Sequence, residues 1–325
     1  MIRTRITEML GIQYPIIGGT MMNISRPEFV AACSNAGGLG VIASAIYRDS
    51  VDGLREAIRQ TRKLTDKPFA VNINLFPMLQ PVDPKQFAKA VLEEGVKIVE
   101  TSGHHAPEEF VAMFREAGAT WMHKCAGVRY AKKAAGLGAD IIEVVGFENG
   151  GAVGELDVGT LVMVPCAVDA AGKIPVIGGG GVSDGRGLLA VLSLGAEGII
   201  MGTRILATRE CPIHDNLKQV LVNASETDTV LIMRSLRASH RAWKNAATAK
   251  VLELEVSKSE PMEIFSVSAG DKVRAMYADG DTSKGILYCG QCVGLVHDIP
   301  TVKELFDRIM AEAEAEIKRL GTRVS

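Results

Sequence analysis

Two glycine-rich segments in the second half of the chain have the residue types of a phosphate-binding site. They read 178-GGGGVSDGRG-187 and 201-MGTR-204. Consecutive glycines expose backbone N–H groups, because no Cβ blocks the approach of a ligand. A helix-like stretch opens at residue 184, and a helix N-terminus favours an anion; Thr203 adds a hydroxyl. The GK[ST] of a Walker loop is missing, which favours one phosphate over a triphosphate.

Other residues with binding chemistry follow other apolar runs. Asn74 ends the run FAVNIN, and Lys124 ends the run TWMHKC. A lysine is costly to bury without a partner, so we expect Lys124 to face a phosphate or an electron-rich ring. His123 should point to the opposite side of an extended run and is interpreted as structural. Met21 and Met22 are soft apolar side chains suited to packing on a flat ring.

The loop 146-GFENGGAVGE-155 follows a very apolar run and has the composition of a loop that shapes an active site. Its acid–base side chains are Glu148 and Glu155, and the glycine pair is followed by Ala152. A methyl group can neither accept a proton nor donate a hydrogen bond. The loop therefore predicts a covering role more directly than a proton-transfer role.

Cys289 and Cys292 form a C-x-x-C pair in YCGQCVGL. A redox motif needs a preceding strand and a helix that begins at the first cysteine. A metal site needs a second pair of ligands, and His297 alone does not form such a pair. We interpret the pair as two small residues packed near a turn, with redox or metal binding as the alternatives, and we expect no metal site.

These residues must be positioned by a repeating pattern of short apolar runs, each followed by an amphipathic, helix-like stretch. Continuous apolar strands that alternate with helices predict a parallel sheet covered on both faces, and eight units in about 200 residues favour a (β/α)8 TIM barrel. Glycines at 37–38, 95, 118 and 195 stand where helices should end. The eight runs are 14–19, 38–44, 69–74, 97–102, 120–125, 140–146, 174–180 and 198–203.

The pattern changes after Thr208, and this change sets the predicted domains. Residues 1–208 and 296–325 are predicted to form the barrel, and 209–295 a smaller, mainly helical insertion on the substrate side. The longest helical run of the insertion is predicted over 231–255. A strong amphipathic helix is predicted from near Thr301 to residue 321. In a barrel the chemistry lies at the carboxyl ends of the strands, with phosphate often bound after strands seven and eight, which is where the two glycine segments stand.

The composition indicates an ordinary globular protein. The 325 residues include 47% hydrophobic and 23% charged residues, with a net charge of −2, so no charge imbalance favours nucleic acid. No run of about 18 apolar residues predicts a membrane span, and the N-terminal segment predicts no secretory signal. We expect a cytoplasmic protein with reduced cysteines and a small-molecule substrate; a homodimer stays open.

Taken together, these motifs resemble the nitronate monooxygenase family, formerly called 2-nitropropane dioxygenases. The branch they resemble most is the flavin-dependent NADH:quinone reductase type, and flavin-dependent enoyl-acyl carrier protein reductases are similar. The resemblance covers nearly the whole chain. It is carried by 14-YPIIGGTMM-22, 36-AGGLGVIAS-44, 66-DKPFAVNINLFP-77, 123-HKC-125, 177-IGGGGVSDGRG-187, 200-IMGTRILATRECPIH-214, 231-LIMRSLR-237 and 290-GQCVGL-295.

The resemblance implies a barrel that holds FMN without a covalent bond, and a flavin-dependent oxidoreductase activity with NADH or NADPH as the expected donor. By motif, the phosphate would be held by Gly179, Gly180, Gly181, Gly202 and Thr203. The ring and ribityl chain would lie among Gly19, Met21, Met22, Asn74, Lys124 and Gly151.

The chain departs from the family pattern in the loop at 150-GGAVG-154, because Ala152 stands where the family usually has a histidine. That histidine serves as a base or positions the substrate, so the resemblance assigns no catalytic residue to this chain. Glu148, His104 and His105 are weak candidates to replace it, each interpreted first as a solvated loop residue.

Three hypotheses remain. The first is an FMN-dependent reductase that transfers electrons from NAD(P)H to an organic acceptor, either a quinone or an unsaturated acyl thioester. Hydride transfer to a flavin requires orientation and no general base. The second is a nitronate monooxygenase that oxidises alkyl nitronates with O2 without the usual histidine. The third is a flavin-binding sensor or partner subunit with little catalysis.

Overall fold

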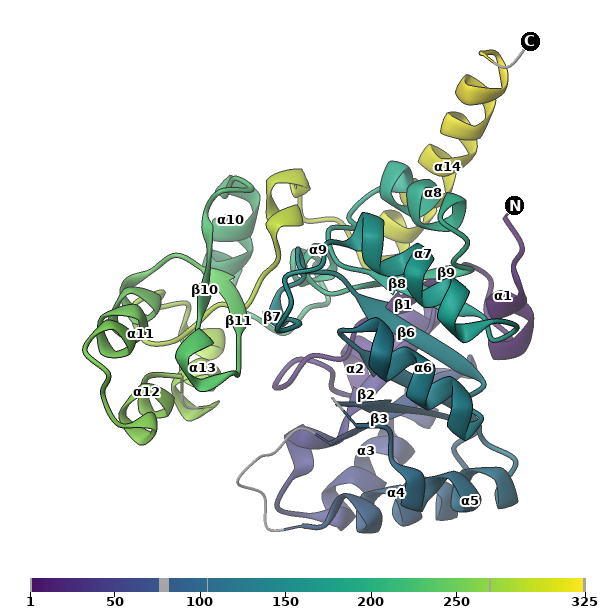
Figure 1. Ribbon diagram of the computed structural model, residues 1–325, viewed down its shortest axis with the longest axis horizontal. Helices are drawn as coiled ribbons and strands as arrows, with labels where there is room; N and C mark the ends of the chain where they lie inside the picture. Colours follow the sequence, from purple (N-terminus) through teal and green to yellow (C-terminus); the bar gives the residue numbers. More distant parts are fainter. Residues whose placement is uncertain (1, 76–81, 104, 269, 324–325) are drawn as a thin grey trace.

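The computed structural model describes residues 2–75, 82–103, 105–268 and 270–323. It shows a barrel with helices around it and a smaller lobe to one side, which contains α10 to α13 (Figure 1). Within these residues no helix combines the length and apolar composition needed to cross a membrane.

Eight parallel strands of the described chain form the barrel wall, in the spatial order β1-β9-β8-β6-β5-β4-β3-β2. A parallel bridge between Ile17 and Leu39 joins β1 to the start of β2 and closes the ring. The predicted (β/α)8 barrel is therefore confirmed, and each strand falls inside its predicted run. The strands are β1 (Ile16–Gly18), β2 (Gly40–Ala43), β3 (Phe69–Asn74), β4 (Ile98–Ser102), β5 (Thr120–Cys125), β6 (Ile141–Val145), β8 (Val176–Gly179) and β9 (Gly198–Met201).

Helices follow the strands and cover the outer face of the barrel. Left-handed glycines end several of them, as predicted: φ is 100° at Gly37, 71° at Gly95, 60° at Gly118 and 93° at Gly195. The helices of the barrel are α1 (Arg5–Leu10), α2 (Pro27–Asn35), α3 (Val51–Leu64), α4 (Pro84–Glu93), α5 (Glu108–Glu116), α6 (Val128–Leu137), α7 (Thr160–Ala171), α8 (Gly185–Ser193), α9 (Thr203–Leu206) and α14 (Val302–Gly321), with a 3-10 turn η1 (Ser44–Tyr47).

Two apolar layers stabilise the barrel. The outer layer lies between strands and helices and contains the large buried side chains Trp121, Phe110 and Phe114. The inner layer lies inside the ring and is joined by side chains of α1 and the turn after it, which close the end of the barrel opposite the mouth. The inner layer consists of Ile6, Leu10, Ile12, Ile17, Leu39, Val41, Ala70, Ile98, Met122, Ile141, Ile177 and Ile200.

The lobe differs in part from its prediction. The helix predicted over 231–255 is wrong in its first half, which forms a β-hairpin of β10 (Thr229–Ile232) and β11 (His240–Trp243). Met233 and Arg237 have φ of 60° and 53°, a left-handed conformation that cannot continue an α-helix. Of the predicted helix, only α11 (Ala246–Val256) forms.

The lobe has its own apolar core and is tied to the barrel by a sheet. Ile232 and Ala242 from the hairpin pack with Val251 of α11 and Ile264. β11 also pairs with β7 (Gly151–Ala152), which belongs to the loop after β6. The lobe therefore lies over the carboxyl ends of the barrel strands. Its other elements are α10 (Asp215–Asn223), η2 (Arg234–Leu236), α12 (Pro261–Val267), α13 (Gly270–Asp279) and η3 (Gln291–Leu295).

The predicted C-terminal helix is confirmed as α14. Thr301 caps it with a reciprocal capping box, because the Thr301 hydroxyl accepts from the Glu304 amide and the Glu304 carboxylate accepts from the Thr301 amide. The first half of α14 packs on the barrel beside α8 and α2, and its last turns extend away from the barrel (Figure 1).

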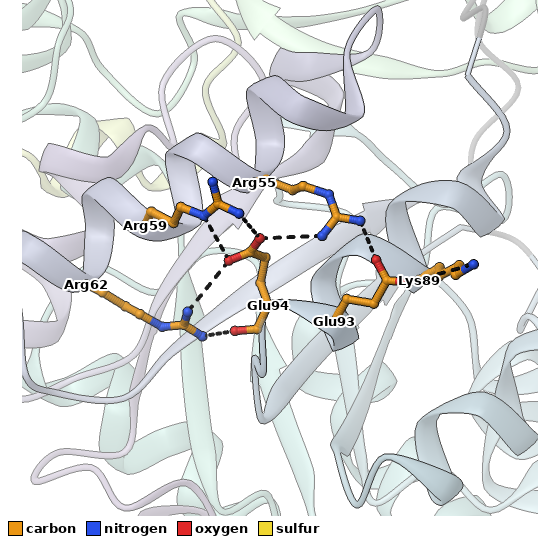
Figure 2. Close-up of polar contacts among 6 residues, drawn as sticks. All are labelled: Arg55, Arg59, Arg62, Lys89, Glu93 and Glu94. Atoms are coloured by element: carbon orange, nitrogen blue, oxygen red, sulfur yellow. Dashed lines mark hydrogen bonds and ion pairs between the residues drawn. The ribbon is translucent and has the colours of Figure 1, made fainter.

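An ion-pair network joins α3 to the end of α4 on the outside of the barrel (Figure 2). The Glu94 carboxylate accepts two hydrogen bonds from Arg59, at 3.2 and 2.7 Å, and one from Arg55 at 3.4 Å. Arg62 donates to the Glu94 carbonyl, and Arg55 also pairs with Glu93. Arg55 and Arg59 lower the pKa of Glu94. We interpret this network as a structural link between two helices.

Candidate active site

The carboxyl ends of parallel strands meet at one end of a barrel, and this end forms the mouth. Adjacent strands are in register, so that Asn74 pairs with Ser102, Ser102 with Lys124, and Lys124 with Glu143. The predicted residues Asn74 and Lys124 are therefore brought together at the mouth.

The glycine turn after β8 is held in a shape that other residues cannot adopt. Gly180 and Gly181 have φ of 92° and 78°. A Cβ on Gly180 would lie 2.8 Å from the Gly146 amide nitrogen and 2.8 Å from the Thr160 hydroxyl. The Thr160 hydroxyl has one hydrogen, and three acceptors lie around it: the Gly180 carbonyl at 2.7 Å, the Glu148 carboxylate at 2.9 Å and the Gly179 carbonyl at 3.2 Å. Across a trans peptide the N–H points opposite to the carbonyl, so the amides of Gly180 and Gly181 point away from Thr160 and can receive an anion.

The N-terminus of α8, which we expected to favour an anion, is already satisfied. The Asp184 carboxylate accepts from the Gly187 amide at 2.9 Å, and the Glu312 carboxylate accepts from the Gly185 amide at 2.9 Å. Two protein carboxylates occupy the place a phosphate would take, so this part of the prediction is wrong. An anion bound beside α8 would therefore have to be held by the backbone amides of the glycine turn.

The second glycine segment contacts both β1 and the turn before η3. The Gly19 amide donates to the Met201 carbonyl at 2.7 Å, and a Cβ on Gly19 would lie 2.8 Å from the same oxygen. The Thr203 hydroxyl accepts from the Gly290 amide at 2.8 Å. Gly202, next to Thr203, lies near Met21, whose sulfur would be 3.7 Å from a Cβ at that position.

The two methionines differ in exposure. Met21 is partly buried and packs against the outer core, whereas Met22 is 44% exposed. Met22 therefore offers more of its side chain to a ligand than Met21, which contributes mainly to the wall beside Gly202.

Below the mouth, the barrel interior contains a polar cluster built around Glu100. Its Oε1 accepts from Lys124 Nζ at 2.9 Å, from Asn72 Nδ2 at 2.5 Å and from Thr20 Oγ1 at 2.6 Å. Thr20 follows β1 and Glu100 lies on β4, so this bond crosses the inside of the barrel. Asn72 also donates to Ser102 at 3.0 Å. Lys124 is thus held by a buried carboxylate while 17% of its side chain stays exposed.

Glu143 of β6 lies next to this cluster and is fully buried. Neither of its carboxyl oxygens has a hydrogen-bond partner among the described residues. Burial, reinforced by the nearby Glu100 carboxylate, raises the pKa of Glu143 well above its usual range. The sequence analysis missed both Glu100 and Glu143. An acidic residue directly after apolar residues in the middle of a strand, as in IVE (98–100) and IIE (141–143), was the available signal.

His123 points away from this cluster, as predicted. Its Nδ1 lies 2.9 Å from the Thr101 hydroxyl, to which Trp121 Nε1 donates at 2.8 Å. Trp121 belongs to the outer apolar layer. Burial lowers the pKa of His123 to about 4, so the imidazole is neutral at physiological pH and has a structural role.

Ala152 lies in β7, directly across from His240 of β11. Directly paired residues of an antiparallel sheet have side chains on the same face, with Cβ atoms about 5 Å apart. His240 Nδ1 lies 2.6 Å from the Ala238 carbonyl, and its ring contacts Tyr288 with centroids 5.6 Å apart. Burial lowers the pKa of His240. A neutral imidazole, which the sequence analysis did not single out, therefore neighbours the Ala152 position.

The candidate replacements for a base occupy different surroundings. The Glu148 carboxylate accepts from the Thr160 amide and hydroxyl at the start of α7, each at 2.9 Å. His105 contacts Tyr130 edge to face, with centroids 6.4 Å apart. His104 lies outside the described residues, as does most of the 76–84 loop. Gly151 has φ of 74° and no described atom within 4 Å of a Cβ placed there, so it borders open space.

Cys289 and Cys292 are buried where the lobe meets the loop after β6. A Cβ on Gly150 would lie 2.7 Å from Cys289 Cα, and the Gln291 amide donates to the Glu148 carbonyl at 2.9 Å. Burial raises the pKa of both thiols. Among the described residues no cluster of His, Cys, Asp and Glu could hold a metal. The packing around the pair agrees with its interpretation as a turn.

These residues fit a flat cofactor with one phosphate. The turn at Gly180 leaves no room for a Cβ and presents two amides, which suits close approach of a phosphate. Lys124 places a partly exposed cation at the mouth, and Gly151, in the loop after β6, borders open space. FMN has a single phosphate and a flat ring that gains negative charge on reduction, and the two halves of the site match these two parts.

Known proteins share this architecture over the whole chain. FabK from Thermotoga maritima superposes with a TM-score of 0.92 at 34% identity, covering 100% of both chains. A Rhodococcus jostii (strain RHA1) protein, "(3aS,4S,5R,7aS)-5-hydroxy-7a-methyl-1-oxo-octahydro-1H-indene-4-carboxyl-CoA dehydrogenase", is 33% identical over 98% of each chain. A "Probable nitronate monooxygenase" of Staphylococcus saprophyticus is 32% identical over 70% of this chain and 75% of its own.

The model of the nitronate monooxygenase family matches residues 3–312. The barrel with its glycine turn, the relatives that cover the full chain and the family match agree with one another. The chain therefore belongs to the nitronate monooxygenase family and is a flavin-dependent oxidoreductase.

Proposed function

We propose that this protein binds FMN and transfers electrons between NADH or NADPH and a small organic acceptor. The observation that carries the proposal is the glycine turn after β8, whose carbonyls face the Thr160 hydroxyl while the amides of Gly180 and Gly181 are directed away from it. When bound, FMN would supply the redox chemistry, and the protein would supply binding, orientation and charge.

Each part of the site then has a task. The Gly180 and Gly181 amides would hold the phosphate, and Lys124 would place its positive charge beside the ring, where a cation favours the reduced, more negative form. The β10-β11-β7 sheet covers the mouth and limits the access of water. Ala152 leaves the position that follows the glycine pair without a proton-transferring side chain. Hydride transfer between two flat rings depends on stacking and orientation, so this loss is compatible with a reductase.

An acyl thioester is the acceptor class that we favour, with a quinone as the alternative. The Rhodococcus jostii relative that covers 98% of the chain is named for a carboxyl-CoA substrate. Arg234 and Arg237 are exposed at the turn between β10 and β11, where they could contact the phosphates of a CoA. Arg234 pairs with Asp157 at 2.9 Å, which leaves Arg237 as the more available of the two.

The test is anaerobic rapid mixing of the purified, FMN-loaded protein with NADH and then NADPH, recording the visible flavin absorbance. Bleaching within seconds by either nucleotide is expected and identifies the donor. A screen of acyl-CoA thioesters and quinones as reoxidants then identifies the acceptor class. If neither nucleotide bleaches the flavin, the reductase proposal is wrong, and bound flavin without turnover would favour a sensor or partner subunit.

Nitronate oxidation is the second candidate, because the family model and the staphylococcal relatives have that name. An alkyl nitronate is already deprotonated, so Ala152 does not exclude it. Oxygen consumption with an alkyl nitronate, in the absence of nicotinamide, would support this function. No oxygen consumption above the rate of free FMN would eliminate it.

A further inference from the structure

Two carboxyl groups and one ammonium group share the interior of the barrel below the mouth. Glu100 and Glu143 are both 0% exposed and lie on β4 and β6, the two neighbours of the strand that carries Lys124. Glu100 Oε1 accepts three hydrogen bonds, but Glu100 Oε2 and both oxygens of Glu143 have no partner among the described residues. An ionised, unpartnered carboxylate at this depth would be very costly.

One proton resolves this arrangement. Glu143 pairs with Lys124 across β6 and β5, and Glu100 of β4 accepts from the same lysine, so both carboxyls face the barrel interior beside Lys124. Two carboxyl groups can form a hydrogen bond only if one of them is protonated. A protonated Glu143 would donate to Glu100 Oε2, which satisfies both orphaned groups with a single bond. Lys124, together with the hydroxyl of Thr20, favours the ionised form of Glu100, so the proton resides on Glu143.

None of the other described titratable groups near the two carboxyls changes its charge near neutral pH. Among the described residues, the titratable groups near the pair are Lys124, His123 and Cys125. Burial lowers the pKa of His123 to about 4 and raises that of Cys125 to about 12, so both are neutral. The cluster therefore holds one negative charge, one positive charge and one proton.

We propose that Glu143 is a buried carboxylic acid that shares its proton with Glu100, and that the pair is the positioning group that directs Lys124 toward the ring bound at the mouth. The shared proton is argued from the contacts inside the barrel. Its effect on Lys124 and on the bound ring rests on the proposed FMN site. If both carboxyls were ionised, the cluster would be negative and would repel the anionic, phosphate-bearing cofactor. If neither were ionised, Lys124 would lose the acceptor that fixes its direction.

The premise is tested on the cofactor-free protein by infrared difference spectroscopy. At about pH 7, where exposed carboxyls are ionised, the wild type should show the C=O stretch of a protonated carboxylic acid, and the band should shift in D2O. The band should be absent from Glu143→Gln and present in the control Glu109→Gln, which changes an exposed carboxylate on α5. A wild-type spectrum without this band at pH 7 overturns the inference.

The consequence is tested by FMN titration of two matched variants. Glu143→Gln keeps a donor for Glu100, whereas Glu143→Leu fills the same space without one. We expect Glu143→Leu to weaken FMN binding about tenfold, and Glu143→Gln to restore it to within about twofold of the wild type. Equal affinity of the two variants overturns the positioning role. If the wild type itself fails to bind FMN, the proposed function is wrong, while the infrared band still decides whether the proton is shared.

Discussion

The glycine turn after β8 provides the most direct test of the cofactor site, through the substitution Gly180→Ala. Gly180 has φ of 92°, a conformation that strains an L-residue by about 1–3 kcal/mol. The added Cβ would also lie 2.8 Å from the Gly146 amide nitrogen, 2.9 Å from the Gly146 carbonyl and 2.8 Å from the Thr160 hydroxyl. Relieving such overlap costs about another 1–3 kcal/mol.

The total effect on the free energy of unfolding is therefore about 2–6 kcal/mol for Gly180→Ala. Gly118→Ala is the matched control, because φ is 60° and no described atom lies within 4 Å of its Cβ. It carries strain without overlap and should cost about 1–2 kcal/mol. Urea unfolding of the cofactor-free proteins measures both values. Equal destabilisation by the two substitutions would show that the overlap at Gly180 is relaxed without cost.

The functional readout is the preference for FMN over riboflavin, which has the same ring and no phosphate. Moving the turn displaces the amides of Gly180 and Gly181, and each lost hydrogen bond to a charged group is worth about 1.5–3 kcal/mol. FMN affinity of Gly180→Ala should therefore fall about 10- to 100-fold. Riboflavin affinity should change by less than about threefold, since its contacts lie elsewhere. An unchanged FMN-to-riboflavin ratio would refute the placement of the phosphate at this turn.

Three further predictions concern other parts of the chain. Glu94→Gln removes the carboxylate acceptor shared by Arg55 and Arg59 and should lower Tm by about 2 °C. This loss of Tm should exceed that of Glu93→Gln and should become smaller in high salt. Equal losses of Tm in low and high salt would contradict the ion-pair explanation. Folding raises the pKa of Glu143 above its ordinary value of 4.5, so the stability of the wild type falls as pH rises from 4.5 toward the folded-state pKa. In that pH range the stability of Glu143→Gln relative to the wild type should increase by about 1.4 kcal/mol per pH unit. Parallel pH profiles of the two proteins in urea unfolding would count against a raised pKa. Ala152→His adds an imidazole across from His240. It should increase oxygen uptake with a neutral nitroalkane, which must first lose a proton, by about 100-fold if a base is what the loop lacks. No increase in a variant that still binds FMN would show that a base at this position is not sufficient.

The barrel could be predicted because its signals are local and repeated. Each strand reads as a short apolar run, since both faces of a parallel barrel strand are covered. Glycines such as Gly37 and Gly195 mark helix ends because the left-handed conformation there disfavours other residues. The hairpin at 229–243 could not be read in the same way. Its backbone reverses at Met233 and Arg237, two non-glycine residues with positive φ, and helix formers such as Leu231 and Arg234 gave the opposite signal.

The candidate site also has parts that the local sequence predicted and parts that it did not. The glycine turn was visible in the sequence because its residues are consecutive, and Lys124 because it is a charged residue next to the end of a strand. The error at the N-terminus of α8 arose from Glu312, which is 127 residues away from the amide it binds. No local pattern could show that a carboxylate from α14 already satisfies this helix end. Long-range contacts decide which of several anion-binding features stays available to a ligand.

Glu100 and Glu143 show why the interior of the site was harder to predict than its rim. Each is the one charged residue of its strand, and the two are 43 positions apart. Their relation becomes visible only when β5 places Lys124 between them. One lysine balances one carboxylate, so the second carboxyl must keep its proton to remain buried. The same balance of charges decides the effect of a substitution at Glu100, Lys124 or Glu143. Removing Lys124 alone would leave a buried carboxylate without a cation, and Glu100 would then be expected to take up a proton as well. The charge presented at the mouth is therefore a property of the three side chains together, and no single one of them sets it.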